Sequence, residues 1–227
     1  MRSNTKDRVR EAAVSLFAKN GYEATGIRDI AKEAGISLAS LYGHIASKED
    51  LLVWIMEGSL RRLHEGSVEA LRAYTEPVDQ IAVLVRIHVF SHAKRRQSAV
   101  VVDTEIRSLS GDKFEYIVGL RDEYERVWRD VIRQGALDGS FDVKEPKIGS
   151  LALLEMCTGV SHWFRSDGEF DLTYVSDVFV DSALGLLRAK RNGTPLRVYE
   201  VANVDAENIF ATIDSRESSN DMSDDIK

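Results

Sequence analysis

Cysteine, proline and long apolar runs are all scarce in this sequence of 227 residues. The single cysteine, Cys157, excludes an intrachain disulfide, and the apolar run around it predicts a buried, inert thiol rather than a redox switch. The sequence has neither a signal-peptide pattern nor an apolar run of about 20 residues, the length that spans a bilayer. We therefore expect a cytoplasmic protein without a membrane partner.

Catalytic motifs are also missing. The sequence has no nucleophile elbow, no phosphate-binding glycine loop, no metal motif and no pair of carboxylates in an obvious cleft. His88 and His92 lie one helical turn apart, but no third ligand accompanies them at metal-motif spacing. We expect neither an enzyme nor a bound metal or cofactor, and we interpret the two histidines as hydrogen-bonding groups.

Strand-like alternation is absent before the last part of the chain, and the three prolines, Pro77, Pro146 and Pro195, fall at apparent helix boundaries. The pattern predicts an all-α fold. Apolar periodicity and turn signals place helices at about 6–20, 27–34, 38–44, 48–74, 77–95, 98–109, 112–138, 146–166 and 171–190.

The most informative segment, residues 21–52, has the pattern of two short helices, a tight turn and a further helix start. In the first helix, Ile27, Ile30 and Ala31 are spaced to form one buried face, and Thr25 precedes them as the expected N-cap. This segment predicts a helix-turn-helix, and therefore DNA binding.

The turn and the second helix support the same interpretation. Gly35 stands where a helix stops in the left-handed conformation, and Ser37 follows as the N-cap of the helix 38–44. Leu41 is the one strongly apolar residue placed to anchor that helix, which is otherwise rich in hydrogen-bonding side chains. After Ser47, the expected free amides of the next helix, beside Lys48, predict an anion site suited to a DNA phosphate.

Charge is distributed unevenly along the chain. The formal net charge is -7, but residues 1–48 hold eight basic and five acidic side chains, a local excess of +3. Local charge governs attraction to phosphate, so we expect a specific DNA binder whose affinity falls with salt.

Residues 5–55 resemble the DNA-binding domain of the TetR family of bacterial repressors, with its order of helix, Gly-Tyr, Thr, helix, Gly, Ser, recognition helix, Tyr-x-His and Ser-Lys-Glu-x-Leu-Leu. The resemblance implies phosphate or base contacts from Thr25, Ser37, Leu38, Ala39, Ser40, Tyr42, His44 and Lys48. Two residues depart from the family pattern: Gly26 replaces a usual Ser or Thr, and Ile45 replaces a usual Phe, as a core substitution.

The resemblance also implies the organisation of the whole chain. We expect a three-helix DNA-binding domain over residues 1–50, a helical ligand-binding and dimerisation domain over 51–190, and an acidic, partly disordered tail over 191–227. About nine helices would form the first two parts. The helices 146–166 and 171–190 would pair with those of a second copy, although for Leu151, Leu154 and Leu186 a place in the subunit core remains an equal alternative.

A stripe along the long helix 112–138 is the expected place of a ligand pocket. Aromatic and apolar side chains recur there at three- and four-residue steps, and Arg121 interrupts them as a cation that needs a partner, either Glu105, Glu125 or the anionic group of a ligand. The residues we propose for ligand binding are His88, His92, Glu105, Phe114, Ile117, Arg121, Tyr124, Trp128 and Trp163.

The segments 104–141 and 161–170 are similar, at scattered positions, to TetR-type regulators of lipid, fatty-acid and steroid breakdown that acyl-CoA thioesters release from DNA. This resemblance implies a repressor that binds a palindromic operator as a dimer and is released by a small hydrophobic effector. Two alternatives stay open: a ligand-independent architectural or division factor, and a drug-responsive efflux regulator.

Overall fold

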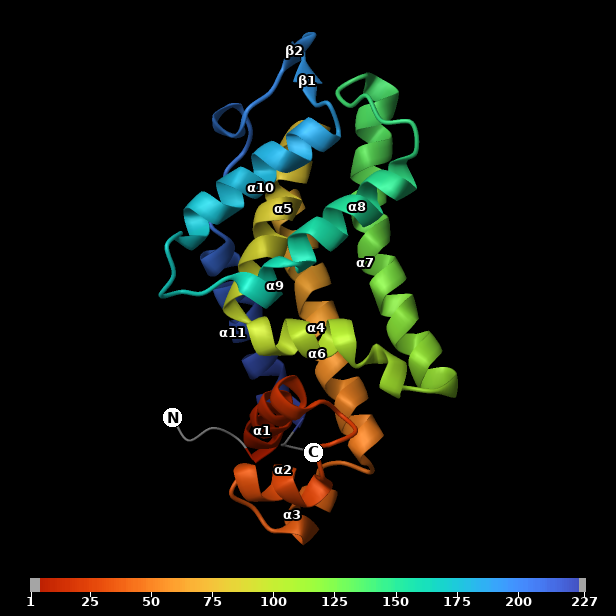
Figure 1. Cartoon of the computed structure of the whole chain (residues 1–227), viewed down its shortest axis with the longest axis vertical. Helices are drawn as coiled ribbons and strands as arrows, with labels where there is room; N and C mark the ends of the chain where they lie inside the picture. Colours follow the sequence, from red (N-terminus) through yellow and green to blue (C-terminus); the bar gives the residue numbers. More distant parts are fainter. Residues whose placement is uncertain (1–4, 225–227) are drawn as a thin grey trace. The chain divides into compact units, whose positions relative to one another are not determined.

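The computed structural model describes residues 5–224, with their side chains up to residue 215, and is mainly helical. Its helices are α1 (Thr5–Asn20), α2 (Ile27–Glu33), α3 (Leu38–Tyr42), α4 (Lys48–Leu71), α5 (Pro77–Lys94), α6 (Arg96–Thr104), α7 (Gly111–Asp138), α8 (Pro146–Thr158), α9 (Val160–Trp163), α10 (Leu172–Leu186) and α11 (Ala206–Asp224) (Figure 1). Two short 3₁₀ helices, η1 (Ile106–Ser108) and η2 (Val198–Glu200), and a two-stranded sheet of β1 (Lys190–Arg191) and β2 (Thr194–Pro195) complete the fold. The all-α prediction is confirmed.

The chain divides into two compact units. Unit 1 comprises the residues up to Leu60 together with Arg95–Arg121, and unit 2 comprises Arg61–Lys94 together with the chain from Asp122 onward. Because the long helices α4 and α7 each contribute to both units, each unit is made of two separate segments of the chain. The end of the DNA-binding domain, predicted at residue 50, stays a prediction.

Unit 1 has its own apolar core. Phe17 of α1, Ile30 of α2, Leu41 of α3 and Leu52 of α4 are all at most 1% exposed and belong to one cluster. Helix α1 also packs against α6. The short helices α2 and α3 have too few residues to be stable alone, so this shared core holds the helix-turn-helix in place.

Unit 2 is built around α5. All of its residues from Ile81 to Val89 are buried, as expected for a helix that is covered on all sides. Helices α8, α9, α10 and α11 pack against it. Within the described residues, no helix combines the length and the apolar composition needed to cross a membrane.

The expected count of about nine helices is exceeded for two local reasons. Gly159 separates α8 from α9 within the segment predicted as one helix, and α11 follows residue 190. Ahead of α11, Asn192 and Gly193 both have positive φ values, 51° and 81°, as a tight hairpin turn requires, and they join β1 to β2. The disorder predicted for the chain end includes residues 225–227, which lie outside the described residues.

Candidate nucleic-acid interface and effector region

Helix α2 begins in a different way from the sequence prediction. Its N-cap is Gly26, whose amide donates to Asp29 Oδ2 at 3.1 Å, whereas Thr25 was expected to cap. The Thr25 hydroxyl instead donates to the carbonyl oxygen of Gly21 at 2.8 Å and lies 3.3 Å from that of Leu16. A Cβ atom at position 26 would lie 2.8 Å from Asp29 Oδ2, so glycine there leaves room for the capping carboxylate.

The turn between α2 and α3 is fixed by backbone hydrogen bonds. The amide of Gly35 donates to the carbonyl oxygen of Lys32, and the amide of Ile36 donates to that of Ala31. This pair of hydrogen bonds ends many helices. Gly35 has a φ of +66°, a conformation that glycine adopts without strain. The predicted left-handed stop at Gly35 is confirmed, and it sets the direction in which α3 leaves the turn.

Helix α3 is held at its start and at its buried side. Ser37 Oγ accepts the amide of Ser40 at 3.1 Å, which confirms the predicted N-cap. Leu41 is 0% exposed and anchors the helix in the unit 1 core, and Ile45 is buried beside it as expected for a core substitution. The helix therefore presents its remaining side chains outward from a rigid frame.

Most of the residues proposed to contact DNA lie on this outer surface. Tyr42 is 52% exposed, and Leu38 is half-buried. The other exposed members are Ser37, Ala39, Ser40 and His44. Arg28 and Lys32 of α2 are exposed as well, although sequence reasoning did not single them out. The surface thus combines hydroxyl, imidazole and cationic groups, the types that bind phosphates and base edges.

Thr25 and Lys48 differ from the other proposed contacts. Thr25 is 2% exposed, and its hydroxyl is engaged inside the unit. The Lys48 ammonium donates to the carbonyl oxygens of Tyr22 at 2.9 Å and of Thr25 at 3.0 Å, and lies 4.0 Å from the centre of the Tyr22 ring. In this structure both side chains hold the loop between α1 and α2, so their effect on DNA binding would act through the position of that loop.

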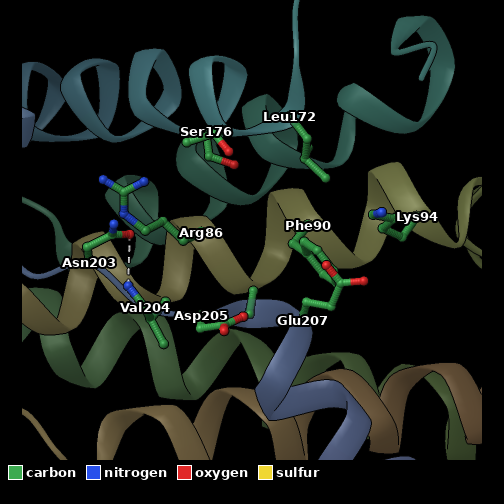
Figure 2. Close-up of a pocket in the computed structure, with 11 residues that line it drawn as sticks. Arg86, Phe90, Lys94, Leu172, Ser176, Asn203, Val204, Asp205 and Glu207 are labelled. Atoms are coloured by element: carbon green, nitrogen blue, oxygen red, sulfur yellow. Dashed lines mark hydrogen bonds between the residues drawn. The ribbon is translucent and has the colours of Figure 1, made fainter. Parts of the chain in front are cut away.

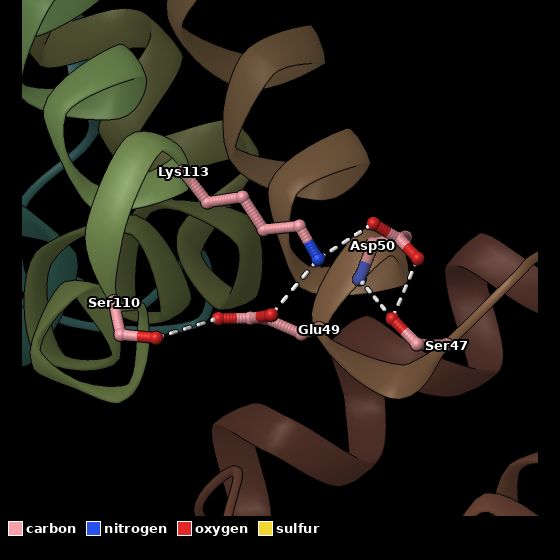
Figure 3. Close-up of polar contacts among 5 residues, drawn as sticks. All are labelled: Ser47, Glu49, Asp50, Ser110 and Lys113. Atoms are coloured by element: carbon pink, nitrogen blue, oxygen red, sulfur yellow. Dashed lines mark hydrogen bonds and ion pairs between the residues drawn. The ribbon is translucent and has the colours of Figure 1, made fainter.

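At the start of α4, where free amides beside Lys48 were predicted to form an anion site, the Asp50 amide already has a side-chain partner. Ser47 caps the helix by accepting the amide of Asp50 at 3.0 Å and donating to Asp50 Oδ2 at 2.6 Å (Figure 3). The Lys113 ammonium, at the start of α7, lies 2.8 Å from Glu49 Oε2 and 2.7 Å from Asp50 Oδ1. Carboxylates therefore occupy the first turn of α4, and their partner is a lysine 64 residues away from Glu49 that no local pattern identified.

These contacts shift the titration of all three groups. Hydrogen bonding to Lys113 lowers the pKa of both the Glu49 and the Asp50 carboxyl groups, and the two carboxylates raise the pKa of the Lys113 ammonium. Ser110 also donates to Glu49, at 3.4 Å. The start of α7 is thereby tied to the helix that follows the recognition helix, both within unit 1.

Four of the residues proposed for ligand binding come together in unit 2. His88 Nδ1 lies 3.1 Å from the Tyr124 hydroxyl and His88 Nε2 lies 3.1 Å from the Thr158 hydroxyl, while the His92 ring stacks on that of His88 at 3.8 Å. Trp128 meets the His88 ring edge-on at 5.7 Å. Burial holds the pKa of His88 well below its usual value and raises that of Tyr124, so both groups stay neutral near pH 7.

The other proposed ligand residues do not join this cluster. Glu105, Phe114, Ile117 and Arg121 belong to unit 1, and Trp163 is 50% exposed in unit 2. The ion pair of Arg121 is with Asp103, at 4.0 Å, rather than with either glutamate expected from sequence.

Glu105 and Glu125 have other partners. Glu105 lies within hydrogen-bonding distance of the hydroxyls of Thr104 and Ser108, both at 3.4 Å. Glu125 accepts a hydrogen bond from Ser150 and pairs with Arg129 at 3.5 Å.

The predicted stripe on α7 is divided between two apolar cores, because Phe114 and Ile117 belong to the core of unit 1 and Tyr124 and Trp128 belong to that of unit 2. Unit 2 also contains a cavity of about 360 Å³ between α5, α10 and residues 203–207. None of the nine proposed ligand residues lines this cavity.

Helices α8 and α10 carry exposed apolar side chains. Leu151 of α8 is 47% exposed, and on α10 Tyr174, Val178 and Leu186 are 55%, 44% and 42% exposed. Leu154 is partly buried against the unit 2 core. For Leu151, Leu154 and Leu186 the sequence left the subunit core and the dimer interface as equal alternatives. Leu151 and Leu186 lie at the surface of the single chain.

Comparison with known proteins places this geometry in a family. Residues 9–54 match the model of bacterial regulatory proteins of the tetR family, and residues 74–187 match the model of the tetracyclin repressor-like C-terminal domain. The HTH-type transcriptional repressor KstR2 of Mycolicibacterium smegmatis is 26% identical over 185 residues, which cover 81% of this chain and 90% of the relative.

Solved structures agree with the family models. A bacterial regulatory protein in the tetR family from Rhodococcus RHA1 is 30% identical, with a TM-score of 0.78 over 83% of this chain and 100% of that one. AibR, solved in complex with isovaleryl coenzyme A and operator DNA, shares the fold at 23% identity, with a TM-score of 0.73 over 79% of this chain and 97% of AibR. The chain belongs to the TetR family of transcriptional regulators, which are DNA-binding proteins and not enzymes.

Proposed function

We propose that this protein is a cytoplasmic transcriptional repressor that binds a palindromic operator as a homodimer and is released from it by a small hydrophobic effector. The observation that carries the DNA-binding part is the geometry of α3. The N-cap Ser37 and the buried Leu41 fix the helix, while Ser40 and Tyr42 stay exposed along its outer side. A recognition helix requires this combination of a rigid frame and free polar side chains.

The chemistry of α3 suggests how bases and phosphates are divided among its residues. Ser37, Tyr42 and His44 offer hydrogen-bonding groups suited to phosphates, and Ser40 and Tyr42 lie toward the base edges in the family's arrangement. Leu38 and Ala39 offer only apolar surface, which suits the methyl group of thymine in the major groove. The exposed cations Arg28 and Lys32 add attraction to the DNA backbone.

The exposed apolar surface of α8 and α10 supports the dimer. Large contiguous apolar surface is uncommon on monomeric proteins and marks sites of association. A palindromic operator presents its two half-sites about 34 Å or a multiple of it apart, and a two-fold dimer supplies one copy of α3 for each half-site.

The effector is proposed to be an acyl-CoA thioester. AibR, solved in complex with isovaleryl coenzyme A and operator DNA, supports this choice of effector class. In this chain the buried group around His88 and Tyr124 combines hydrogen-bonding atoms with aromatic surface, which is the composition of many small-molecule sites. Release follows if the effector prefers a conformation of the dimer whose recognition helices no longer match the operator, and a few kcal/mol of differential affinity is enough.

The experiment begins with selection of double-stranded DNA from a random library by the purified protein. A palindromic consensus, bound as two chains per site in sedimentation, is the expected result, and recovery of DNA without a consensus would contradict specific operator binding. The selected operator is then titrated with acyl-CoA esters, free fatty acids and aromatic drugs in fluorescence anisotropy. Release by drugs alone would indicate an efflux regulator, and release by none of them would contradict the effector part while leaving operator binding intact.

A further inference from the structure

Unit 2 contains a cavity that none of the residues proposed for effector binding lines. It has a volume of about 360 Å³ and lies between α5, the start of α10 and residues 203–207 (Figure 2). Phe90, Leu172 and Val204 contribute apolar surface to its lining. A volume of this size is within the usual range of pockets that bind small molecules, about 300–1,000 Å³.

The polar group at one end of the cavity is Arg86. Its side chain is only 7% exposed, and its Nη1 donates to Asp177 Oδ1 at 2.6 Å. Its buried Nε–H has no hydrogen-bond acceptor among the described residues. Because Arg86 lines the cavity, a ligand oxygen seated against its guanidinium would supply a further hydrogen-bond acceptor.

One wall of the cavity comes from the segment that follows the matched family domain, which ends at residue 187. Two hydrogen bonds anchor the start of this wall: the Ala202 amide donates to Asp79 Oδ1 at 2.8 Å, and the Tyr74 hydroxyl donates to the Asn203 carbonyl oxygen at 2.8 Å. It is anchored again within α11, where the Phe210 ring stacks on that of Phe90 at 5.9 Å.

A second anchor in α11 is ionic. Arg62 donates to both carboxylate oxygens of Asp214, at 2.6 and 2.8 Å, and its guanidinium lies 4.3 Å from the centre of the Phe210 ring. Paired hydrogen bonds of this kind fix direction as well as position. The wall is therefore held from both sides, and these anchors maintain the shape of the cavity.

The charges around the cavity indicate what it would accept. Arg86 and Lys94 contribute two positive charges, and Asp205, Glu207 and the Arg86 partner Asp177 contribute three negative ones. Because Asp177 already neutralises Arg86, a second anion gains little there and meets two further carboxylates. An uncharged oxygen acceptor on an apolar body suits these surroundings better than a carboxylate does.

We propose that this cavity is a second small-molecule site, for a neutral compound whose apolar body lies against Phe90 and whose carbonyl oxygen accepts a hydrogen bond from Arg86. The site is separate from the proposed effector cluster, because neither His88 nor Tyr124 lines it. The proposal of this second site is therefore independent of the acyl-CoA proposal, and failure of either one leaves the other intact.

The test uses two probes that differ in charge but little in shape: 4-phenylbutan-2-one, a neutral ketone, and 3-phenylpropanoate, its carboxylate counterpart. Both are titrated into the full-length protein and followed by saturation-transfer NMR. The ketone should bind with a dissociation constant of about 1 mM, as expected for a ligand of this size, and the carboxylate at least about threefold more weakly. Equal or tighter binding of the carboxylate, or no ketone binding at about 10 mM, would overturn the proposal.

Variants locate the binding. Thr173, in the first turn of α10, and Asn203, ahead of α11, are exposed residues of the cavity lining, so Thr173→Trp and Asn203→Trp should each fill the cavity and abolish ketone binding. Thr194→Trp, exposed in β2 and remote from the cavity lining, is the matched control and should bind the ketone like the wild type. Unchanged binding in whichever cavity variant folds, judged by its melting temperature, would place the ketone elsewhere and refute the site.

Charge is tested separately. Glu207→Gln removes one negative charge from an exposed position in the first turn of α11. It should strengthen binding of 3-phenylpropanoate a few-fold at low salt and leave binding of the ketone unchanged, because only the carboxylate is repelled. A change of the same size for both probes would contradict the charge argument.

Discussion

The Lys48 ammonium lies 4.0 Å from the centre of the Tyr22 ring and donates a hydrogen bond to the Tyr22 carbonyl oxygen at 2.9 Å. A second hydrogen bond, to Thr25, joins the same ammonium to the end of the loop between α1 and α2. The lysine that the family motif suggests as a phosphate contact thus acts inside unit 1 as a clamp on this loop.

We therefore expect Lys48→Ala to destabilise the protein by about 1–2 kcal/mol, because two charge-assisted hydrogen bonds are lost from the α1–α2 loop. Urea denaturation followed by circular dichroism measures the change. Lys32→Ala, at an exposed position of α2, is the control and should change the free energy of unfolding by less than about 0.5 kcal/mol. Equal stability of the Lys48→Ala variant and the wild type would contradict the clamp.

Tyr42→Phe is expected to weaken operator binding about fivefold without changing stability. The Tyr42 side chain is 52% exposed, so its hydroxyl is free to contact DNA, and the loss of one such hydrogen bond costs about 1 kcal/mol. Fluorescence anisotropy with the selected operator gives the affinity, and thermal melting gives the stability. Tyr199→Phe, at an 83% exposed position of unit 2, should bind like the wild type. A Tyr42→Phe variant of full affinity would remove this residue from the interface.

Val178→Asp should convert the dimer to a folded monomer. Val178 is 44% exposed in the single chain, so the subunit core tolerates the carboxylate, but a dimer interface would bury it unpaired at a cost of several kcal/mol. Sedimentation velocity measures the mass, and circular dichroism verifies the fold. Tyr199→Asp, on η2, is the matched surface control and should remain dimeric. A wild type that sediments as a monomer would refute the interface altogether.

Stability should fall as the pH is lowered below about 6.5, because burial depresses the pKa of His88 in the folded protein. The unfolded chain then binds a proton that folded His88 does not, so this contribution is complete above pH 6.5 and is lost between that pH and the lower folded pKa. The slope is at most about 1.4 kcal/mol per pH unit. His88→Gln should show a shallower pH dependence in urea denaturation between pH 7.5 and 5.5. Identical slopes in the two proteins would show that His88 is not the group responsible.

Local signals in the sequence were enough to determine most of the helices and the motif. The stop at Gly35, the cap at Ser37 and the anchor at Leu41 are each recognisable within a few residues, because the hydrogen bonds and packing they make are with near neighbours in the chain. The prolines at the starts of α5 and α8 acted in the same local way. The all-α class and the recognition helix could therefore be predicted from the sequence alone.

Only the tertiary structure decided what the long side chains do. The partners of Lys48, Lys113, Arg62 and Arg86 lie between 23 and 152 residues away along the chain, and no periodicity encodes which of many carboxylates or carbonyls a flexible cation will meet. The same holds for the stripe on α7, which one helical pattern presents as continuous although two separate cores divide it. The cavity beside Phe90 depends on α11 folding back onto α5, a contact between segments far apart in sequence that is decided by packing rather than by local propensity.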